Sequence, residues 1–233
     1  MLSLLQLCDT LFPIGGFAYS DGLETATTAQ AQPGMTPVKP AVSDVRDLGD
    51  WIEACLDETI GRLEGPAVWQ AWAAFQDSDW HALSALDQEL DALRPAAGAR
   101  RSSRAMGLRL LTTWQTLHPD PRLEQAAALV RAGQLGPALP IAFAGACATA
   151  GIDRRQAVEA FAYTRLAATV SAAMRLMPLG QTDAHGLLAR TLDRVPAVVD
   201  GIIERDGEIE SFSPALDIAA MTQQYLHSRL FRS

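Results

Sequence analysis

The side chains that could perform chemistry in this sequence are few and scattered. Cysteines occur at positions 8, 55 and 147, and histidines at positions 81, 118, 185 and 227. A protein metal site needs several such ligands at short, regular spacing, and no CxxC or Cys/His pair shows that spacing. His185, beside Asp183 and just after a Gly-containing turn, is the most noticeable histidine. Even this residue is expected not to be a ligand, so the sequence predicts no fixed metal site.

Sequence patterns for catalysis are also absent. The chain has no GxSxG nucleophile elbow, no phosphate-binding P-loop and no HExxH zinc motif. The odd number of widely spaced cysteines favours a reduced, cytoplasmic compartment rather than a disulfide framework. We therefore expect a protein without catalytic residues.

An arginine cluster and an acidic total charge bear on possible partners. The segment "ARRSSRAMG" (99–107) brings together Arg100, Arg101 and Arg104, which we interpret as a solvated helix face or, alternatively, a patch for an acidic partner. The chain as a whole has a formal net charge of −8, which argues against nucleic-acid binding. The start lacks the pattern of a signal peptide, and the longest uncharged run, 132–152, contains two prolines and is too weakly apolar to span a membrane.

Helical periodicity dominates the chain, while strand-like alternation is almost absent. The sequence therefore predicts an all-α fold, a single-domain helical bundle of about ten helices covering residues 1–233. The expected helices cover roughly 2–10, 20–29, 48–60, 65–76, 79–93, 98–117, 121–133, 154–177, 182–193, 196–204 and 214–228. The 154–177 helix carries the clearest signals, because Asp153 is placed to cap it and apolar residues from Val158 to Met174 form a stripe along it.

Two segments interrupt this helical pattern. The stretch "LFPIGGFAYSDGLE" (11–24) contains one proline and three glycines, a composition typical of a tight turn, a catalytic loop or a docking surface. Residues 31–47 hold three prolines and little periodicity, so we expect a mobile loop there. The C-terminal end, 225–233, mixes large apolar side chains with arginines. This mixture predicts either an interaction tail or a segment folded back onto the core.

Three separated stretches resemble one known family. "LFPIGGFAYSDGLE", "MRLMPLGQTD" and "SFSPALDIAAMTQQYLHSRLFRS" are similar to motifs of the urease accessory protein UreF family, and "RSSRAMG" resembles a weaker central motif of that family. The matches occur in order, at about the expected spacing, and span nearly the whole chain. Two positions depart from the pattern: Asp21 stands where many members have His, and His185 stands where Gln is common.

The resemblance implies a function that composition alone does not. Members of the family are all-helical and dimeric, and they bind the accessory protein UreD (also called UreH) and the GTPase UreG in an assembly that delivers nickel to apo-urease. It implies that nickel is handled by the complex and that no cofactor is bound tightly by this chain. The Pro/Gly stretch would then be a shaped surface near the partner contacts.

Candidate interface residues follow from the family motifs and from the sequence patterns together. The expected partner-binding residues are Pro13, Gly15, Gly16, Tyr19, Asp21, Arg104, Gly180, Gln181, Tyr225, Arg229, Leu230 and Arg232. Tyr163 and Arg165 flank the stripe of the 154–177 helix, which needs a covering surface, so we expect them near the interface of a symmetric homodimer. We also expect the tail to be loosely packed in the free protein and to become ordered on binding.

An alternative function stays open at this point. The protein could act as a GTPase-activating protein for UreG by supplying an arginine in trans. The sequence offers Arg101, Arg104, Arg165, Arg229 and Arg232 as candidates for this role, and no feature selects one of them.

Overall fold

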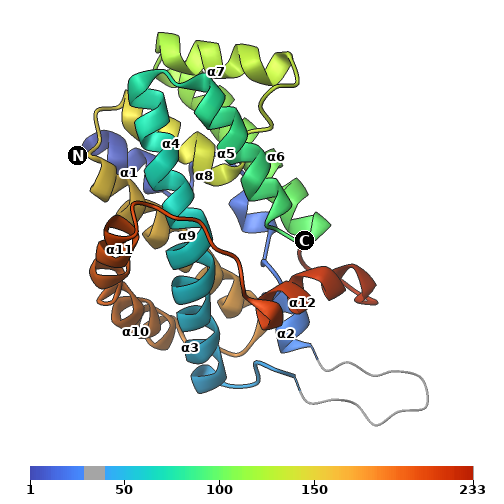
Figure 1. Cartoon of the computed structure of the whole chain (residues 1–233). Coiled ribbons are helices and arrows are strands. Elements are labelled where there is room, and N and C mark those ends of the chain that lie inside the picture. Colours follow the sequence, from blue (N-terminus) through green and yellow to red (C-terminus); the bar gives the residue numbers. More distant parts are fainter. Residues whose placement is uncertain (29–39, 233) are drawn as a thin grey trace.

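The chain folds into an all-α bundle, as the periodicity predicts. The computed structural model describes residues 1–28 and 40–232, and within them there is no β-strand (Figure 1). The first half contains α1 (Leu2–Cys8), α2 (Leu23–Thr27), α3 (Val45–Ala54), α4 (Gly65–Asp77), α5 (Trp80–Ala92) and α6 (Ala97–Leu117). The second half contains α7 (Pro121–Arg131), α8 (Leu139–Thr149), α9 (Arg154–Leu176), α10 (Gln181–Leu192), α11 (Val195–Glu204) and α12 (Pro214–Thr222).

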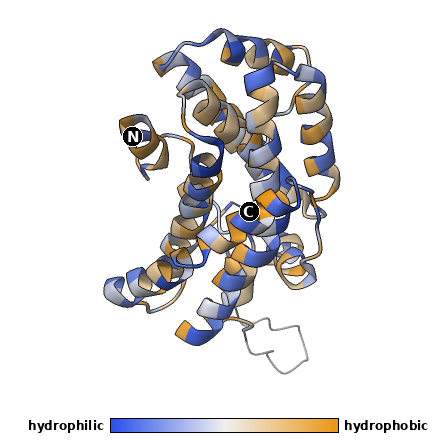
Figure 2. Cartoon of the chain, turned by 60° about the vertical axis from the view of Figure 1, so that its left-hand side comes forward, coloured by the Kyte–Doolittle hydropathy of each residue, from blue (hydrophilic) through white to orange (hydrophobic). Residues whose placement is uncertain are grey.

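Helix α8 lies at the centre of the bundle. Every residue from Leu139 to Ala148 is buried, and α8 packs against α4, α6 and α9. Its side chains are mostly small, which lets the neighbouring helices approach closely, as its Ala/Gly-rich sequence indicates. On the outer helices, by contrast, hydrophilic and hydrophobic residues both occur along the same helix (Figure 2).

Helices α3 and α4 form one continuous rod, which differs from the predicted pair of helices at 48–60 and 65–76. A π-helical segment, Cys55–Glu64, joins them (Figure 1). Pro66 has no N–H to donate to the carbonyl of Arg62 four residues earlier, so this carbonyl lacks its regular helical partner. The backbone N–H of Glu210 donates to that carbonyl instead, at 2.9 Å. The rod therefore continues because a distant segment satisfies the unpaired carbonyl.

The stretch predicted as a mobile loop, 31–47, is only partly described. Residues 31–39 lie outside the described residues. The remainder is more ordered than expected: Val42 is buried and its N–H donates to the carbonyl of Ala26, at 2.9 Å. Asp44 then caps α3 by accepting from the backbone N–H groups of Arg46 and Asp47. The prediction was wrong for 44–47, because this capping starts the helix at Val45.

Helix α9 passes through the middle of the molecule and confirms the strongest helix prediction. Asp153 caps it by accepting from the backbone N–H groups of Arg155 and Gln156. It contacts α1 and α2 from the N-terminal end as well as α10 and α11 from the C-terminal half. Its apolar stripe, including Val158, Phe161 and Leu166, is buried within the chain. The stripe therefore needs no second copy to cover it, and our argument for a dimer from this stripe was wrong.

A segment near the start of the chain and one near its end meet in the fold. Helices α2 and α12 lie side by side although almost the whole sequence separates them (Figure 1). Helix α12 is shorter than the predicted 214–228 helix and continues only as a 3₁₀ turn, Gln223–Tyr225. This arrangement places the N-terminal Pro/Gly stretch against the C-terminal motif.

Candidate functional site

The Pro/Gly stretch makes two left-handed turns that position α2. Gly15 has φ +78° and precedes a 3₁₀ turn at Gly16–Ala18, while Asp21 and Gly22 have φ +48° and +89°. A Cβ atom on Gly22 would lie 2.7 Å from the backbone nitrogen of Ala220 in α12. Glycine is required there for both the backbone angle and the close approach of α12. The stretch is therefore a turn that other helices pack against.

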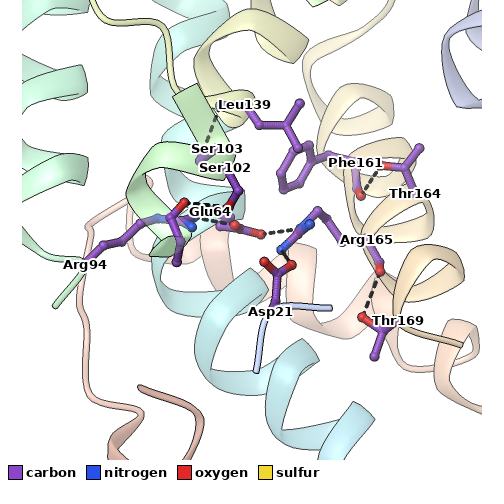
Figure 3. A network of polar contacts seen from close by, with 11 residues as sticks. Asp21, Glu64, Arg94, Ser102, Ser103, Leu139, Phe161, Thr164, Arg165 and Thr169 are labelled. Carbon is purple, nitrogen blue, oxygen red and sulfur yellow. Dashed lines mark hydrogen bonds and ion pairs between the residues drawn. The ribbon is translucent and has the colours of Figure 1, made fainter. Parts of the chain in front are cut away.

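A buried ion-pair network fixes this turn to α9 (Figure 3). Arg165 of α9 donates through Nη2 to Asp21 Oδ2 at 2.5 Å and through Nε to Glu64 Oε2 at 3.0 Å. Arg94 also pairs with Glu64, through the other carboxylate oxygen. The Glu64 side chain is only 2% exposed, so its charge is balanced almost entirely by these two guanidinium groups.

The network determines how its members ionise. Burial by itself would raise the pKa of Asp21, but the adjacent guanidinium of Arg165 and the nearby Arg94 outweigh it, so the pKa lies below its usual value. Burial acts to lower the pKa of Arg165, yet Asp21 and Glu64 raise it overall. Burial, and then the charge of Asp21, raises the pKa of the neighbouring Cys55 thiol to about 12. Asp21 and Arg165 are thus held charged, and the Cys55 thiol is held neutral.

The C-terminal tail lies against the same turn. Phe231 is 3% exposed, and the backbone N–H of Arg232 donates to the carbonyl of Ala18 at 2.8 Å. Our expectation of a loosely packed tail was therefore wrong at this end of it. The sequence also allowed a tail that folds back onto the core, and the burial of Phe231 agrees with that alternative.

An apolar face nevertheless points away from the molecule beside this turn. Figure 2 shows strongly hydrophobic residues on the ribbon next to the C-terminus. The exposed large side chains of this face are Phe212 (78% exposed), Ile218 (60%), Met221 (44%), Tyr225 (78%) and Leu230 (55%). Arg229 and Arg232 are exposed next to them, and no ion pair is found for either side chain in the part of the chain that the structure describes. This combined surface, which we call the α12 face, has the aromatic, aliphatic and arginine content of a protein interface.

The structure brings some of the predicted site residues together and separates others. Pro13, Gly15, Gly16, Tyr19 and Asp21 lie in the turn, and Tyr225, Arg229, Leu230 and Arg232 lie in the segment that meets it. Arg104 is committed within the chain, because its Nε donates to Asp91 Oδ1 at 3.0 Å. Gly180 is the N-cap residue of α10 and Gln181 is its first residue, so this pair starts a helix.

The two residues expected at a dimer interface have different environments. Tyr163 is 41% exposed and is available to a partner. The Arg165 side chain is only 16% exposed, and its guanidinium is occupied by Asp21 and Glu64. Arg165 is therefore an internal residue of the fold, which also makes it a poor arginine donor in trans.

The sequence reasoning missed four residues that build the site: Glu64 and Arg94 of the ion-pair network, and Glu24 and Arg175, which contact the C-terminal tail. Glu24 and Glu64 are 5% and 1% exposed. Nothing in the sequence marks either of them as buried, because other polar residues surround both in "LETAT" and "CLDETIGRLE". Their partners could not be identified from spacing, since they come from distant parts of the sequence.

Among the described residues, no group of three or more His, Cys, Asp or Glu side chains is placed to hold a metal ion. Within the same residues, no helix is both long and apolar enough to cross a membrane.

The fold and the site define an all-α protein in which the N-terminal turn and the C-terminal segment share one surface. The sequence model of the UreF family matches residues 42–192. The chain is 35% identical to the urease accessory protein UreF of Methylibium petroleiphilum, over the whole chain and 94% of the relative. It is 31% identical to UreF of Methylobacillus flagellatus and 30% identical to UreF of a Polaromonas species, again over the whole chain and 97% and 94% of those relatives. This chain therefore belongs to the UreF family of urease accessory proteins.

Proposed function

We propose that the protein is a non-catalytic scaffold for urease maturation. In this proposal a cytoplasmic homodimer joins UreD/UreH and the GTPase UreG, and the assembly delivers nickel into apo-urease. The chain binds no cofactor tightly, because the complex as a whole handles the nickel. Membership of the UreF family and the names of its relatives support the link to urease.

The α12 face is the observation that carries a docking role. Five large apolar side chains are 44–78% exposed on one short segment at the end of the chain. Exposed apolar patches of this kind mark interaction sites, because leaving them in water is unfavourable. The face also lies against the Pro/Gly turn, so two of the three stretches that resemble the family contribute to one region.

The charge of this region indicates the chemistry of its partner. The protein has a formal net charge of −8, yet Arg229 and Arg232 border the α12 face without an acidic partner among the described residues. Exposed guanidinium groups can form bidentate contacts with carboxylates. We therefore propose that the docking partner presents an apolar centre with acidic residues around it.

The test is copurification of the full chain with its cognate UreD and UreG, followed by an assay of urease activation. Tyr225→Ala and Arg229→Ala are expected to weaken capture by at least about tenfold, because central aromatic and arginine residues dominate interface energies. Leu117→Ser is the control, because Leu117 is 51% exposed at the C-terminal end of α6 and is not part of the α12 face. Truncation after Gln224 is a poor substitute, because it also removes the buried Phe231.

Two results would contradict this proposal. One is a wild-type chain that captures neither partner. The other is a pair of variants, Tyr225→Ala and Arg229→Ala, that capture both partners and activate urease as well as the wild type. In the second case the docking site would lie elsewhere on the surface.

Stimulation of GTP hydrolysis by UreG is a second candidate function. Arg165 is a poor candidate for insertion into a partner, because its guanidinium is held in the buried network, whereas Arg104 pairs with Asp91 at the surface and its side chain is 43% exposed. Arg101, Arg229 and Arg232 are exposed. Single-turnover GTP hydrolysis by UreG, with wild-type chain and with each of these arginines changed to Ala, separates the candidates. A scaffold leaves the rate unchanged, whereas loss of an inserted arginine lowers a stimulated rate by about 10³-fold or more.

A further inference from the structure

Three consecutive backbone groups at the end of the chain are fastened to the N-terminal turn. The N–H of Leu230 donates to Glu24 Oε1, and the N–H of Phe231 donates to Glu24 Oε2 at 3.2 Å. The N–H of Arg232 donates to the carbonyl of Ala18 at 2.8 Å. One carboxylate in α2 therefore receives two neighbouring amides from a segment about 200 positions away.

The carboxylate of Glu24 is enclosed by hydrogen-bond donors. Glu24 is 5% exposed, and the side-chain amide of Gln223 also donates to its Oε2, at 3.1 Å. Gln223 in turn donates to Ser20 Oγ at 3.2 Å. A buried carboxylate is costly unless hydrogen bonds replace its lost water, and here part of that replacement comes from the tail itself.

Arg175, in the last turn of α9, connects the same two segments from the other side. Its guanidinium carbon lies 4.0 Å from the centroid of the Phe17 ring and 4.3 Å from that of the Phe231 ring. Its Nη1 also donates to the carbonyl of Phe17 at 2.7 Å. One cation thus contacts an aromatic ring from each end of the chain.

We propose that Glu24 and Arg175 are positioning residues that clasp the tail onto the Pro/Gly turn, so that the free chain already presents both segments as one preformed surface. We call three sets of contacts the terminal clasp: those of Glu24 with residues 230 and 231, those of Arg175 with Phe17 and Phe231, and the backbone hydrogen bond from Arg232 to Ala18. The clasp holds Phe231 inward, while Leu230 and Arg232 on either side of it are exposed. A partner that docks there would not have to order the tail on binding, which is a saving in binding free energy.

The experiment is residue-resolved hydrogen–deuterium exchange on the full chain without partners. In the wild type, the amides of residues 230–232 are expected to exchange at least about tenfold more slowly than an unstructured segment of the same sequence. Glu24→Gln places an amide group where one of two accepting oxygens stood, and Arg175→Ala removes both ring contacts. Each is expected to speed exchange of 230–232 by about tenfold or more, while α8 amides keep their wild-type protection.

Matched controls and a conservative variant make the result specific. Glu204→Gln and Arg190→Ala change the same residue types at exposed positions outside the clasp and are expected to leave the tail amides unaffected. Arg175→Lys keeps a cation near the rings and is expected to restore part of the protection. Arg175 is only partly buried, so its variants decide the matter even if Glu24→Gln does not fold.

The proposal is overturned if wild-type tail amides exchange at the unstructured rate, or if both Glu24→Gln and Arg175→Ala leave their exchange unchanged. The proposal rests on the proposed function only in assuming that a partner docks on this surface. A wild-type chain with a protected tail that captures neither UreD nor UreG would refute the proposed function and leave the clasp standing. Capture that is normal in a chain with an unprotected tail would refute the clasp alone.

Discussion

Arg165 Nη2 lies 2.5 Å from Asp21 Oδ2, although 144 positions separate the two residues in the sequence. The same guanidinium contacts Glu64, so a single side chain of α9 joins the N-terminal turn to the π-helical segment between α3 and α4. π-helical segments are often found at functional sites. In this protein the segment ends at the buried carboxylate of Glu64, which Arg165 of α9 and Arg94 of the α5–α6 connection share.

Replacing Arg165 is expected to destabilise the fold strongly. Arg165→Met leaves Glu64, whose side chain is 2% exposed, with one guanidinium partner instead of two. Loss of one partner from a buried ion pair costs about 3–5 kcal/mol of unfolding free energy. Arg165→Lys is expected to recover only part of this, because an ammonium group lacks the planar fork that reaches both carboxylates. Denaturant unfolding monitored by circular dichroism measures the difference.

The surface pair of Arg131 and Glu124 provides the control for this experiment. Its side chains are 65% and 58% exposed, so Arg131→Lys should change the unfolding free energy by less than about 0.5 kcal/mol. Equal effects of Arg165→Met and Arg131→Lys would contradict a structural role for the buried network.

Acidification is expected to weaken the Asp21 contact. The pKa of Asp21 in the folded chain lies below its usual value, so Asp21 contributes stability above the unfolded pKa, about 3.9. That contribution is lost as the pH falls from there through the lower folded-state pKa. Asp21→Asn tolerates the left-handed backbone at φ +48° and cannot titrate. The measurement is unfolding free energy against pH for both chains, and a loss between pH 5 and 2 that is equally steep in both would contradict the prediction.

The helical framework could be predicted from the sequence because its signals are local. The cap at Asp153 and the stripe that follows it predict a helix over 154–177, and α9 ends one residue earlier, at Leu176. The π-helical segment could not be predicted, because Pro66 leaves the carbonyl of Arg62 without a local donor and the N–H that replaces it belongs to Glu210, 148 positions from Arg62. The continuity of the rod depends on a contact that no local pattern encodes.

The candidate site was predictable in composition but not in connectivity. The Pro/Gly stretch and the tail were both identified as special, yet nothing in either segment indicates that they touch each other. Arg165 was interpreted as a residue flanking an apolar stripe, whereas its two carboxylate partners come from other elements. Polar residues find partners through the tertiary fold, and a single sequence does not record such pairs.

The three thiols are expected to react slowly in the folded chain. Burial raises the pKa of Cys8 to about 11 and that of Cys55 to about 12, and it also raises the pKa of Cys147. Because the thiolate is the reactive form, we expect alkylation at pH 8 to be at least about a hundredfold slower than in denaturant. Mass spectrometry of iodoacetamide-treated chain, native and unfolded, measures this. Rapid labelling of Cys55 in the native chain would show that its surroundings are open to solvent.

The isolated chain is expected to lack a tight nickel site. Nickel binding by cysteine requires thiolates, and the four histidines do not cluster with other ligands in the described residues. Isothermal titration of untagged, chelator-treated protein with nickel should give only weak binding. A stoichiometric site of submicromolar affinity would contradict this and would assign direct metal transfer to this chain.

We expect the chain to form a dimer, on the grounds of the family resemblance and of the exposed Tyr163. The stripe of α9 is covered by its own chain, whereas Tyr163 is 41% exposed on that helix. If Tyr163 lies at a symmetric interface, each of the two copies contributes one Tyr163. Tyr163→Glu then places two negative charges near the symmetry axis and should shift the equilibrium towards the monomer. Sedimentation equilibrium across micromolar concentrations measures this, with the exposed control Leu117→Ser expected to behave as wild type. A wild-type chain that stays monomeric at high micromolar concentration would rule out the dimer, and an unaffected Tyr163→Glu dimer would move its interface away from this face of α9.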